Sequence, residues 1–284
     1  MNLDKSILEP FISNALAEDI GDGDHTSLST IPKGQTGKAK LLIKDNGIIA
    51  GIDVSIEIFK AVDATLLIDI LIQDGETVKP GDIAFYVSGS VHSILKAERL
   101  VLNTMQRMSG IASTTNRIVK ILEGTGTKVL DTRKTTPGLR YLEKLAVKIG
   151  GGVNHRFGLY DMILIKDNHV DYAGGISNAI KSAQDYLKEN KINIPVEVEV
   201  RNLDELKEVM QFGQIDRILL DNFSFTLLKE AVNLVNGSYI TEASGGITED
   251  NVLEYANCGV DYVSMGALTH SVKSLDMSLK AVKP

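Results

Sequence analysis

The second half of the chain alternates short apolar segments with longer amphipathic ones, and this alternation restricts the fold more than any other feature. The strand candidates are residues 128–132, 162–166, 196–200, 217–221, 239–243 and 262–266. The last four recur every 21 to 23 residues, and the segments between them carry apolar residues at three- and four-residue steps, as amphipathic helices do. Strand, helix and strand at this period predict parallel βα units, in a barrel or a large doubly wound sheet.

The first 91 residues have a different pattern, with short elements and frequent turns. The stretch KAKLLIKDNGIIAGID predicts two strands around a turn at residues 45–47, and VSIEIFKAV has the spacing of a helix. The stretch DGETVKPGDIAFYVSGS predicts two more strands around Pro80 and Gly81. We therefore expect a separate α+β domain with an antiparallel sheet at the start of the chain.

Composition excludes several classes of protein. The chain has 284 residues and a net charge of -7, with 43% hydrophobic and 24% charged residues, which is typical of a globular protein and unlike a disordered one. An acidic chain argues against nonspecific nucleic-acid binding, and a single cysteine, Cys258, excludes an intrachain disulfide. The longest apolar run, ATLLIDILI, is too short for a membrane helix, and the first residues lack the apolar core of a signal peptide. We expect a cytoplasmic protein without a membrane partner.

Glycines directly follow the last two predicted strands and favour a barrel. Gly245 and Gly246 lie in EASGGIT, and Gly266 lies in SMGAL, each before a predicted helix. In TIM-type barrels the loops after the last two strands bind phosphate, because glycine lets backbone N–H groups approach the phosphate oxygens. The alternative is that these are ordinary turn glycines.

Positive charge is concentrated in residues 131–169, which hold seven Lys and Arg against four Asp and Glu, a net +3 in a chain of -7. Several of these cations, and one histidine, stand beside predicted strand ends or in the loop GGGVNHRFG. We expect them at the carboxyl-terminal rim of a barrel, where active sites lie: Arg133, Lys134, His155, Arg156 and Lys166. Such a site suits a small ligand with several negative charges, because Arg grips carboxylates and phosphates with paired hydrogen bonds.

For four other ionisable residues the sequence does not indicate a functional role. Lys144 and Lys148 are four residues apart in a helical pattern, so we expect both on a solvated face. Cys258 lies on a helical pattern and is expected in the core rather than as a nucleophile. His270 has no partner visible in the sequence.

The strand VEVEV carries acids where a buried parallel strand is normally apolar throughout. Strand alternation places Glu197 and Glu199 on the same face, and Asp221 closes the next strand, RILLD. Buried carboxylates need a cation or hydrogen-bond donors, and their oxygens suit Mg²⁺ shared with substrate phosphates. We expect Glu199 and Asp221 to contact Mg²⁺ or ribose hydroxyls. Structural pairing of these acids with the cations is the alternative.

Long motifs resemble the quinolinate phosphoribosyltransferase family, the carboxylating nicotinate-nucleotide pyrophosphorylases among the type II phosphoribosyltransferases. They are EDIGDGDHTS, AERLVLNTMQRMSGIAS, DTRKTTPGLR, GGGVNHRFGLYDMILIKDNH, VEVEV, LLDNF, EASGGIT and VSMGALTH, in that order along nearly the whole chain. The resemblance implies an α/β fold: an N-terminal α/β sandwich domain over residues 1–105, with residues 271–284 packing back on it, and an open seven-stranded, TIM-like α/β barrel over residues 106–270.

The resemblance also implies an activity in NAD biosynthesis. The phosphoribosyl group of phosphoribosyl pyrophosphate (PRPP) would pass to quinolinate with decarboxylation, giving nicotinate mononucleotide, pyrophosphate and CO₂, with Mg²⁺ accompanying the pyrophosphate. Catalytic roles fall to Lys134, Glu199 and Asp221, and the last two would also hold the metal. A homodimer with shared sites, or a higher oligomer, is implied. The implied substrate-binding residues are Arg99, Arg133, Lys134, Arg140, His155, Arg156, Lys166, Glu199, Asp221, Ser244, Gly245, Gly246, Ser264 and Gly266, with Arg99, and also Arg140, reaching the site of the neighbouring subunit.

Three alternatives remain at the level of sequence. A related type II phosphoribosyltransferase would use another acceptor, such as nicotinate. A barrel enzyme acting on sugar phosphates would need no pyrophosphate donor. A ligand sensor without activity would bind phosphate tightly and turn nothing over. The density of cations favours the diacid quinolinate over the first, and the full set of cations and inward acids argues against the last.

Overall fold

The computed structural model describes residues 3–282 and divides into two compact units. Unit 1 comprises Met1–Asn116, Thr136–Gly151 and Ser271–Pro284, and unit 2 comprises Arg117–Thr135 and Gly152–His270. This division differs from the expected boundary between residues 105 and 106. That position, which the family resemblance implied, lies inside helix α4, a single helix of 31 residues over Val91–Ile121.

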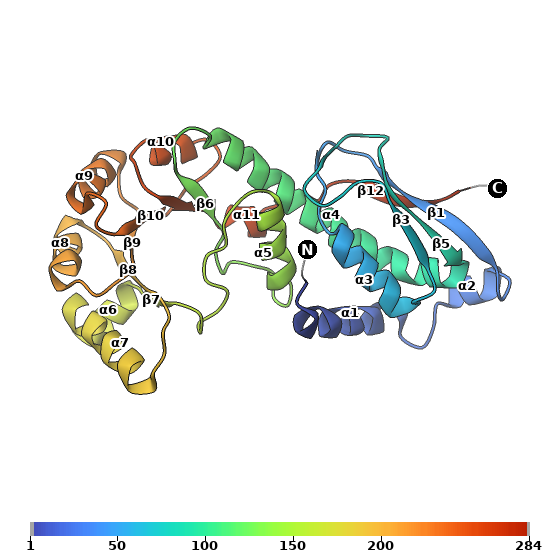
Figure 1. The fold of residues 1–284 in the computed structure, drawn as a ribbon, viewed down its shortest axis with the longest axis horizontal. Helices are drawn as coiled ribbons and strands as arrows, with labels where there is room; N and C mark the ends of the chain where they lie inside the picture. The colour runs from blue at the N-terminus through green and yellow to red at the C-terminus, as the bar shows by residue number, and fades with distance from the viewer. Residues whose placement is uncertain (1–2, 283–284) are drawn as a thin grey trace. The chain divides into compact units, whose positions relative to one another are not determined.

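Unit 1 contains a four-stranded antiparallel sheet in the order β12-β1-β5-β3, and a two-stranded pair, β2-β4 (Figure 1). Its strands are β1 (Thr36–Ile43), β2 (Gly47–Ile48), β3 (Leu67–Ile70), β4 (Thr77–Val78), β5 (Ile83–Ser90) and β12 (Met277–Ala281). Its other helices are α1 (Lys5–Ile20), α2 (His25–Thr30), α3 (Ile52–Val62) and α5 (Arg140–Ile149). The antiparallel α+β architecture expected for this part of the chain is confirmed.

The pairing within unit 1 differs in detail from the sequence pattern. The strands on either side of residues 45–47 do not form a hairpin, because β1 pairs with β5 and β12 whereas β2 pairs with β4. Helix α3 packs on the sheet through an edge-to-face contact of Phe59 with Phe85, whose ring centroids are 5.9 Å apart. Both rings are fully buried, so this contact lies in the core of the unit.

Unit 2 is built on a six-stranded parallel sheet in the order β6-β11-β10-β9-β8-β7. Its strands are β6 (Lys128–Leu130), β7 (Ile163–Ile165), β8 (Val196–Val200), β9 (Arg217–Asp221), β10 (Ile240–Ser244) and β11 (Tyr262–Ser264). Its helices are α6 (Asp167–Ala173), α7 (Ile176–Asn190), α8 (Leu203–Phe212), α9 (Phe225–Val235), α10 (Val252–Ala256) and α11 (Ala267–His270). All six strand candidates are thus strands, and Figure 1 shows α7 to α10 on the outer side of the curved sheet.

The strand count is six where the family resemblance implies seven. Beside β6, Val153 forms one isolated parallel bridge with Leu130, and its N–H donates to the carbonyl of Val129 at 2.9 Å. A single bridged residue is too short to be assigned as a strand. Because β6 and β7 are the two ends of the strand order, the sheet is open.

Local signals explain where the helices of unit 2 begin and end. The side chain of Asn202 accepts hydrogen bonds from the N–H groups of Asp204 and Glu205 and caps α8, and that of Ser224 caps α9 by accepting from Leu227. Helix α9 ends at Asn236 in the left-handed conformation. Within the described residues, no helix has the length and apolarity needed to cross a membrane.

Candidate active site

A cavity of about 740 Å³ lies at the carboxyl ends of the parallel strands of unit 2. Sequence analysis expected the site at this rim, where parallel α/β sheets usually bind ligands. Twelve of the expected residues line the cavity: Arg133, Lys134, His155, Arg156, Lys166, Glu199, Asp221, Ser244, Gly245, Gly246, Ser264 and Gly266. The structure therefore brings together residues that are spread over more than half of unit 2.

The two remaining expected residues lie elsewhere. Arg99 is in helix α4, Arg140 is the first residue of α5, and both belong to unit 1. Neither is among the residues that line the cavity of this chain.

Positive charge is crowded on one side of the cavity. Arg156 is only 9% exposed, and its Nη1 donates to the carbonyl of Met162 at 3.2 Å. Burial and the charge of Arg133 lower the pKa of Arg156, although Glu197 and Asp161 oppose this effect. An anion between two guanidinium groups reduces their electrostatic repulsion. This side of the cavity therefore suits a carboxylate or a phosphate.

The two lysines are positioned by local hydrogen bonds of the backbone. The N–H of Lys134 donates to Thr132 Oγ1 at 3.0 Å, and its carbonyl accepts from Thr269 Oγ1 at 2.9 Å. The N–H of Lys166 donates to His169 Nδ1 at 2.9 Å at the start of α6. These contacts fix the main chain and leave both ammonium-bearing side chains at the cavity wall.

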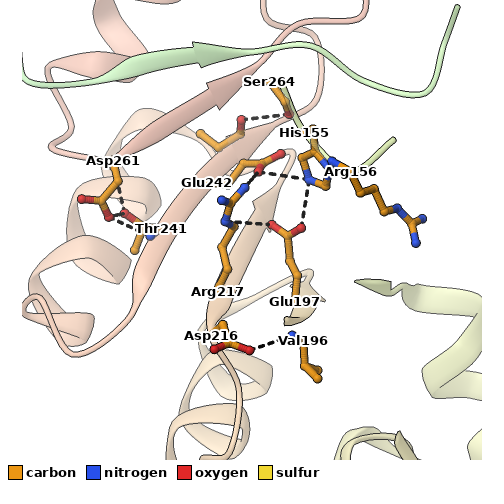
Figure 2. Close-up of polar contacts among 11 residues, drawn as sticks. His155, Arg156, Val196, Glu197, Asp216, Arg217, Thr241, Glu242, Asp261 and Ser264 are labelled. Carbon is orange, nitrogen blue, oxygen red and sulfur yellow. Dashed lines mark hydrogen bonds and ion pairs between the residues drawn. The ribbon is translucent and has the colours of Figure 1, made fainter. Parts of the chain in front are cut away.

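The ring of His155 is engaged on both sides (Figure 2). Its Nε2 lies 2.9 Å from Glu197 Oε2 and 3.4 Å from Glu242 Oε2, and its Nδ1 accepts a hydrogen bond of 2.7 Å from the N–H of Arg156. Its side chain is only 8% exposed. The sequence analysis predicted that His155 binds the ligand. In the structure, both nitrogens of the ring already have partners within the protein.

Arg217 completes this buried cluster of charges. Its Nη1 donates to Glu242 Oε2 at 3.0 Å, its Nε lies 3.9 Å from Glu197 Oε1, and its guanidinium lies 4.8 Å from the centre of the Tyr262 ring. Glu197 and Glu242 are almost fully buried, at 0% and 1% exposure. Ligand atoms of His155, Glu197 and Glu242 are close enough to hold a metal ion, but the guanidinium already supplies their positive charge, so we assign no metal there.

The cluster binds one additional proton at neutral pH. Burial opposes protonation of the ring, but the hydrogen bonds and charges of Glu197 and Glu242 outweigh it and raise the pKa of His155 to about 9. Burial and the charge of Glu242 also raise the pKa of Glu197. Because Nδ1 of the ring accepts the Arg156 N–H, this additional proton is shared across the contact of His155 Nε2 with the two carboxylates, and Glu242 also pairs with Arg217.

Two carboxylates face the cavity from neighbouring strands. Glu199 is on β8 and Asp221 ends β9. Burial and the charge of Asp221 raise the pKa of Glu199. Asp221 Oδ2 accepts a hydrogen bond of 2.6 Å from Asn222 Nδ2. Oxygen ligands that repel each other gain from a hard cation, so the chemistry of this pair is compatible with Mg²⁺.

Close packing explains the glycines of the last two loops. Gly245 has φ +97°, and a Cβ there would collide with the side chain of Asn222. A Cβ at Gly266 would lie 2.9 Å from Lys134 Cδ and 3.0 Å from His270 Nε2. Gly246, with φ +64°, faces open space, so backbone can be approached from the cavity. The loops have the glycine-rich form that binds phosphate groups.

The cavity is also lined by residues that the sequence analysis did not predict, among them Asn222, Glu242 and His270. Glu242 had a usable signal, because it is an acid within a predicted buried strand, as in VEVEV. His270 was considered isolated, yet it lies beside Gly266 and Lys134 at the rim. Asn222 has φ +56°, a left-handed conformation that the sequence LLDNF does not reveal.

One expectation about the cations is wrong. Lys148 is exposed, as a solvated helix face requires, but Lys144 is buried at 1% exposure. The helical spacing of four residues assigns a shared face, but it does not show whether that face meets solvent.

Comparisons with known proteins agree with the cavity and with the fold. The N-terminal domain described as "Quinolinate phosphoribosyl transferase, N-terminal domain" matches residues 24–109, and "Quinolinate phosphoribosyl transferase, C-terminal domain" matches residues 111–280. The chain is 46% identical over 288 aligned positions to an Arabidopsis thaliana protein named chloroplastic nicotinate-nucleotide pyrophosphorylase (carboxylating), covering 96% of this chain and 82% of that one.

Bacterial proteins give the same result. A Bacillus subtilis protein named probable nicotinate-nucleotide pyrophosphorylase (carboxylating) is 42% identical, over 96% of this chain and 92% of its own length. The crystal structure titled NadC from Streptococcus pyogenes superposes with a TM-score of 0.93 at 38% identity, covering 100% of both chains. Since the two domain matches together span most of the sequence, the chain belongs to the quinolinate phosphoribosyl transferase family.

Proposed function

We propose that this protein transfers the phosphoribosyl group of PRPP to quinolinate and releases CO₂, giving nicotinate mononucleotide and pyrophosphate. The observation that carries the proposal is the division of one cavity into a side crowded with Arg133 and Arg156 and a side with Glu199 and Asp221. A dicarboxylate fits the first side. A ribose with its hydroxyls fits the second. The names of the family members support this assignment of substrates.

The cations would bind the acceptor. Quinolinate carries two adjacent carboxylates, and the guanidinium groups of Arg133 and Arg156 can each grip one through paired hydrogen bonds. Lys166 adds charge from the start of α6, and Lys134 would face the pyrophosphate or the carboxylate that is lost. These contacts orient the pyridine nitrogen toward C1 of the ribose and exclude water from the reacting atoms.

The acids and glycine loops would bind the donor. Glu199 and Asp221 accept hydrogen bonds from the ribose hydroxyls and would hold Mg²⁺, and Ser244, Ser264 and the glycines of both loops would surround the 5′-phosphate. When bound, Mg²⁺ supplies positive charge that stabilises the departing pyrophosphate. A cation held by Glu199 and Asp221 would offset the burial and the neighbouring charge that raise the pKa of Glu199.

The reaction needs little acid–base work from the protein. The lone pair of the pyridine nitrogen forms the bond to C1, while the C1–O bond to pyrophosphate breaks and its electrons leave with the pyrophosphate. The carboxylate beside the alkylated, positively charged nitrogen then leaves as CO₂, and the carbon takes up a proton. Lys134, Arg133 and Arg156 stabilise the negative charges throughout, so the contribution of the protein is positioning and electrostatics.

We also propose a homodimer with shared sites. Arg99 and Arg140 lie in unit 1 and do not line the cavity of their own chain, which is consistent with a role in the cavity of a partner subunit. The cytoplasmic location stays a prediction, because some plant relatives are named as chloroplastic or mitochondrial proteins.

An acceptor assay tests the proposed reaction. Purified protein is incubated with Mg²⁺, PRPP and quinolinate labelled in the carboxylate that is lost, and CO₂ and nicotinate mononucleotide are measured together, with nicotinate as the parallel acceptor. We expect equal amounts of both products from quinolinate and none from nicotinate. Product from nicotinate alone would assign the cavity to a related phosphoribosyltransferase, and no product from folded protein would overturn the proposal.

A further inference from the structure

His155 lines the cavity, but its side chain is only 8% exposed and its ring nitrogens bind groups of the protein. Both of its nitrogens are engaged, Nε2 with two carboxylates and Nδ1 with the N–H of Arg156 (Figure 2). A ring held in this way sets the position of the next residue through the backbone. The next residue is Arg156, whose side chain extends from the opposite side of the ring in Figure 2 and lines the cavity.

Glu242 is the point where the contacts of this cluster meet. Its Oε2 lies 3.4 Å from His155 Nε2 and accepts a hydrogen bond of 3.0 Å from Arg217 Nη1. The guanidinium of Arg217 in turn lies over the ring of Tyr262, which is on β11. The carboxylate is on the central strand β10, whose register is fixed on both sides by β9 and β11, so it is a rigid support for the ring.

We propose that Glu242 is a positioning residue for binding of the acceptor dicarboxylate: through His155 it fixes the Arg156 guanidinium at the cavity wall. The inference rests on the proposed function, because it assigns the acceptor to the Arg156 side of the cavity. We assign Glu242 an indirect role because its carboxylate contacts His155 and Arg217, and His155 in turn binds the N–H of Arg156.

Separate contacts hold the rest of this loop in place. Asp131 Oδ1 accepts a hydrogen bond of 2.8 Å from the N–H of His155, and Asp161 accepts from the N–H groups of Phe157 and Gly158 at 2.6 and 2.8 Å. The path of the loop is therefore supported without Glu242. Removing the Glu242 charge should disturb the ring and Arg156 more than the fold.

The charged groups around the ring come from several elements. Glu197 on β8, Arg217 on β9 and Glu242 on β10 face it from the sheet. Asp131, which follows β6, binds its backbone, and Arg156 adjoins it in the same loop, with Arg133 acting on Arg156. Any change of the ring with pH reflects all of these groups, so the test compares variants at fixed pH as well.

The kinetic test uses Glu242→Gln, which keeps the size of the side chain and removes its charge. We expect the KM for quinolinate to rise at least tenfold, while the KM for PRPP stays within twofold. Asp216→Asn and Asp261→Asn are matched controls, because they remove carboxylates of the same sheet at the amino ends of its strands, where Asp216 binds the N–H of Val196 and Asp261 that of Thr241 (Figure 2). Both controls should leave both KM values within twofold. Equal changes in the two KM values, or none, in the Glu242 variant would overturn the inference.

A second readout does not depend on turnover. The chain has five histidines, so ¹⁵N-histidine labelling gives a simple spectrum in which His155→Gln identifies the ring signals. In the wild-type protein we expect ring signals that stay unchanged from pH 6 to 8, because the contacts hold the ring in one state and the pKa of His155 is raised to about 9. In Glu242→Gln we expect averaged tautomers or titration of the ring in this range.

The two readouts separate the possible failures. A wild-type ring that averages its tautomers, or that titrates between pH 6 and 8, would contradict the contacts with Glu242 and Arg156 and overturn the inference. A fixed ring together with no product from quinolinate would instead overturn the proposed function, while the positional role of Glu242 would be retained for whichever acceptor the wild-type protein uses. In that case the same comparison of KM values is made with that acceptor.

Discussion

Both ends of the parallel sheet in unit 2 carry acidic residues, but the surroundings of these acids differ. At the amino ends, Asp216 Oδ2 accepts a hydrogen bond of 2.7 Å from the N–H of Val196, and Asp261 Oδ2 accepts two of 2.8 Å from the N–H and Oγ1 of Thr241. At the carboxyl ends, Glu199 faces Asp221, and burial together with that second charge raises its pKa. The acids of the first set are satisfied by donors of the chain, whereas for Glu199 the effects of burial and of Asp221 outweigh those of the Asp167 N–H and Lys166.

This difference separates stability from function within one sheet. A carboxylate that accepts backbone N–H bonds stabilises the fold, because it replaces hydrogen bonds that the strand ends would otherwise make to water. Carboxylates that repel each other at a cavity reduce the stability of the free protein and are suited to a cation or a hydroxyl-bearing ligand. The amino ends of the strands therefore support the fold, and the carboxyl ends support the proposed reaction. Four predictions test this contrast.

The largest effect is expected from the cations at the carboxyl ends. Lys134→Ala and Arg156→Ala should each lower kcat/KM by about 10²–10³-fold, because the charges that stabilise the substrate and the transition state are lost. Their melting temperatures should change by no more than about 3 °C. Kinetics with PRPP and quinolinate, together with thermal unfolding, measure both quantities. Near-wild-type kcat/KM in both variants would remove these residues from the proposed mechanism.

The next effect concerns pH and the buried cluster around His155. The folded protein holds the additional proton with a pKa of about 9, whereas an unfolded histidine releases it near its ordinary value of 6.5. This contribution to stability is therefore fully present below pH 6.5 and is lost as the pH rises toward 9. We expect the free energy of unfolding in urea to fall by roughly 3 kcal/mol across this window. Glu242→Gln should show a much smaller fall, and equal pH dependence in the two proteins would contradict this account of the cluster.

The acids at the carboxyl ends should affect activity and stability in opposite directions. Glu199→Gln and Asp221→Asn should lower kcat/KM by about 10²-fold and raise the Mg²⁺ concentration needed for half-maximal rate, because metal and ribose contacts are lost. The free energy of unfolding should stay the same or increase by less than about 1 kcal/mol, since a repulsion is removed. Clear destabilisation of both variants would show that these acids support the fold, as Asp216 and Asp261 do.

The smallest effect is expected at the amino ends. Asp216→Asn and Asp261→Asn should each lower the free energy of unfolding by about 1 kcal/mol, because charge-assisted hydrogen bonds to the backbone become neutral ones. Their kcat/KM should remain within twofold of wild type. Chemical denaturation and the acceptor assay measure the two quantities. A loss of activity without a loss of stability at either position would remove the contrast between the two ends.

Much of the fold could be predicted because the pattern repeats. Strands such as VEVEV and RILLD are bounded by helices of regular period, so their order and parallel pairing follow from the sequence. The ends of the shorter strands were less certain, since the last predicted strand, over residues 262–266, ends at Ser264 in the structure. The sequence made no prediction of the extent of α4, because an uninterrupted helix carries no signal where one unit gives way to the next.

The sequence predicted many of the residues of the candidate site but not the contacts between them. Glycines and charges next to strand ends identified the rim, because the carboxyl ends of parallel strands converge. The inward direction of the His155 ring could not be predicted, since its partners Glu197 and Glu242 come from strands far along the chain. The burial of Lys144 was missed for the same reason, because exposure depends on tertiary packing and not on helical spacing.

The position of β12 has a consequence for biosynthesis. This strand pairs with β1 along five residues, from Ala39 with Ala281 to Ile43 with Met277, yet it is made about 230 residues later. At the usual rate of translation, β1 waits roughly 10 to 50 s for its neighbour. During this interval one side of β1 presents unpaired backbone groups, and all of unit 2 leaves the ribosome first. The sheet of unit 1, although it begins near the start of the chain, is therefore among the last parts of the protein to be completed.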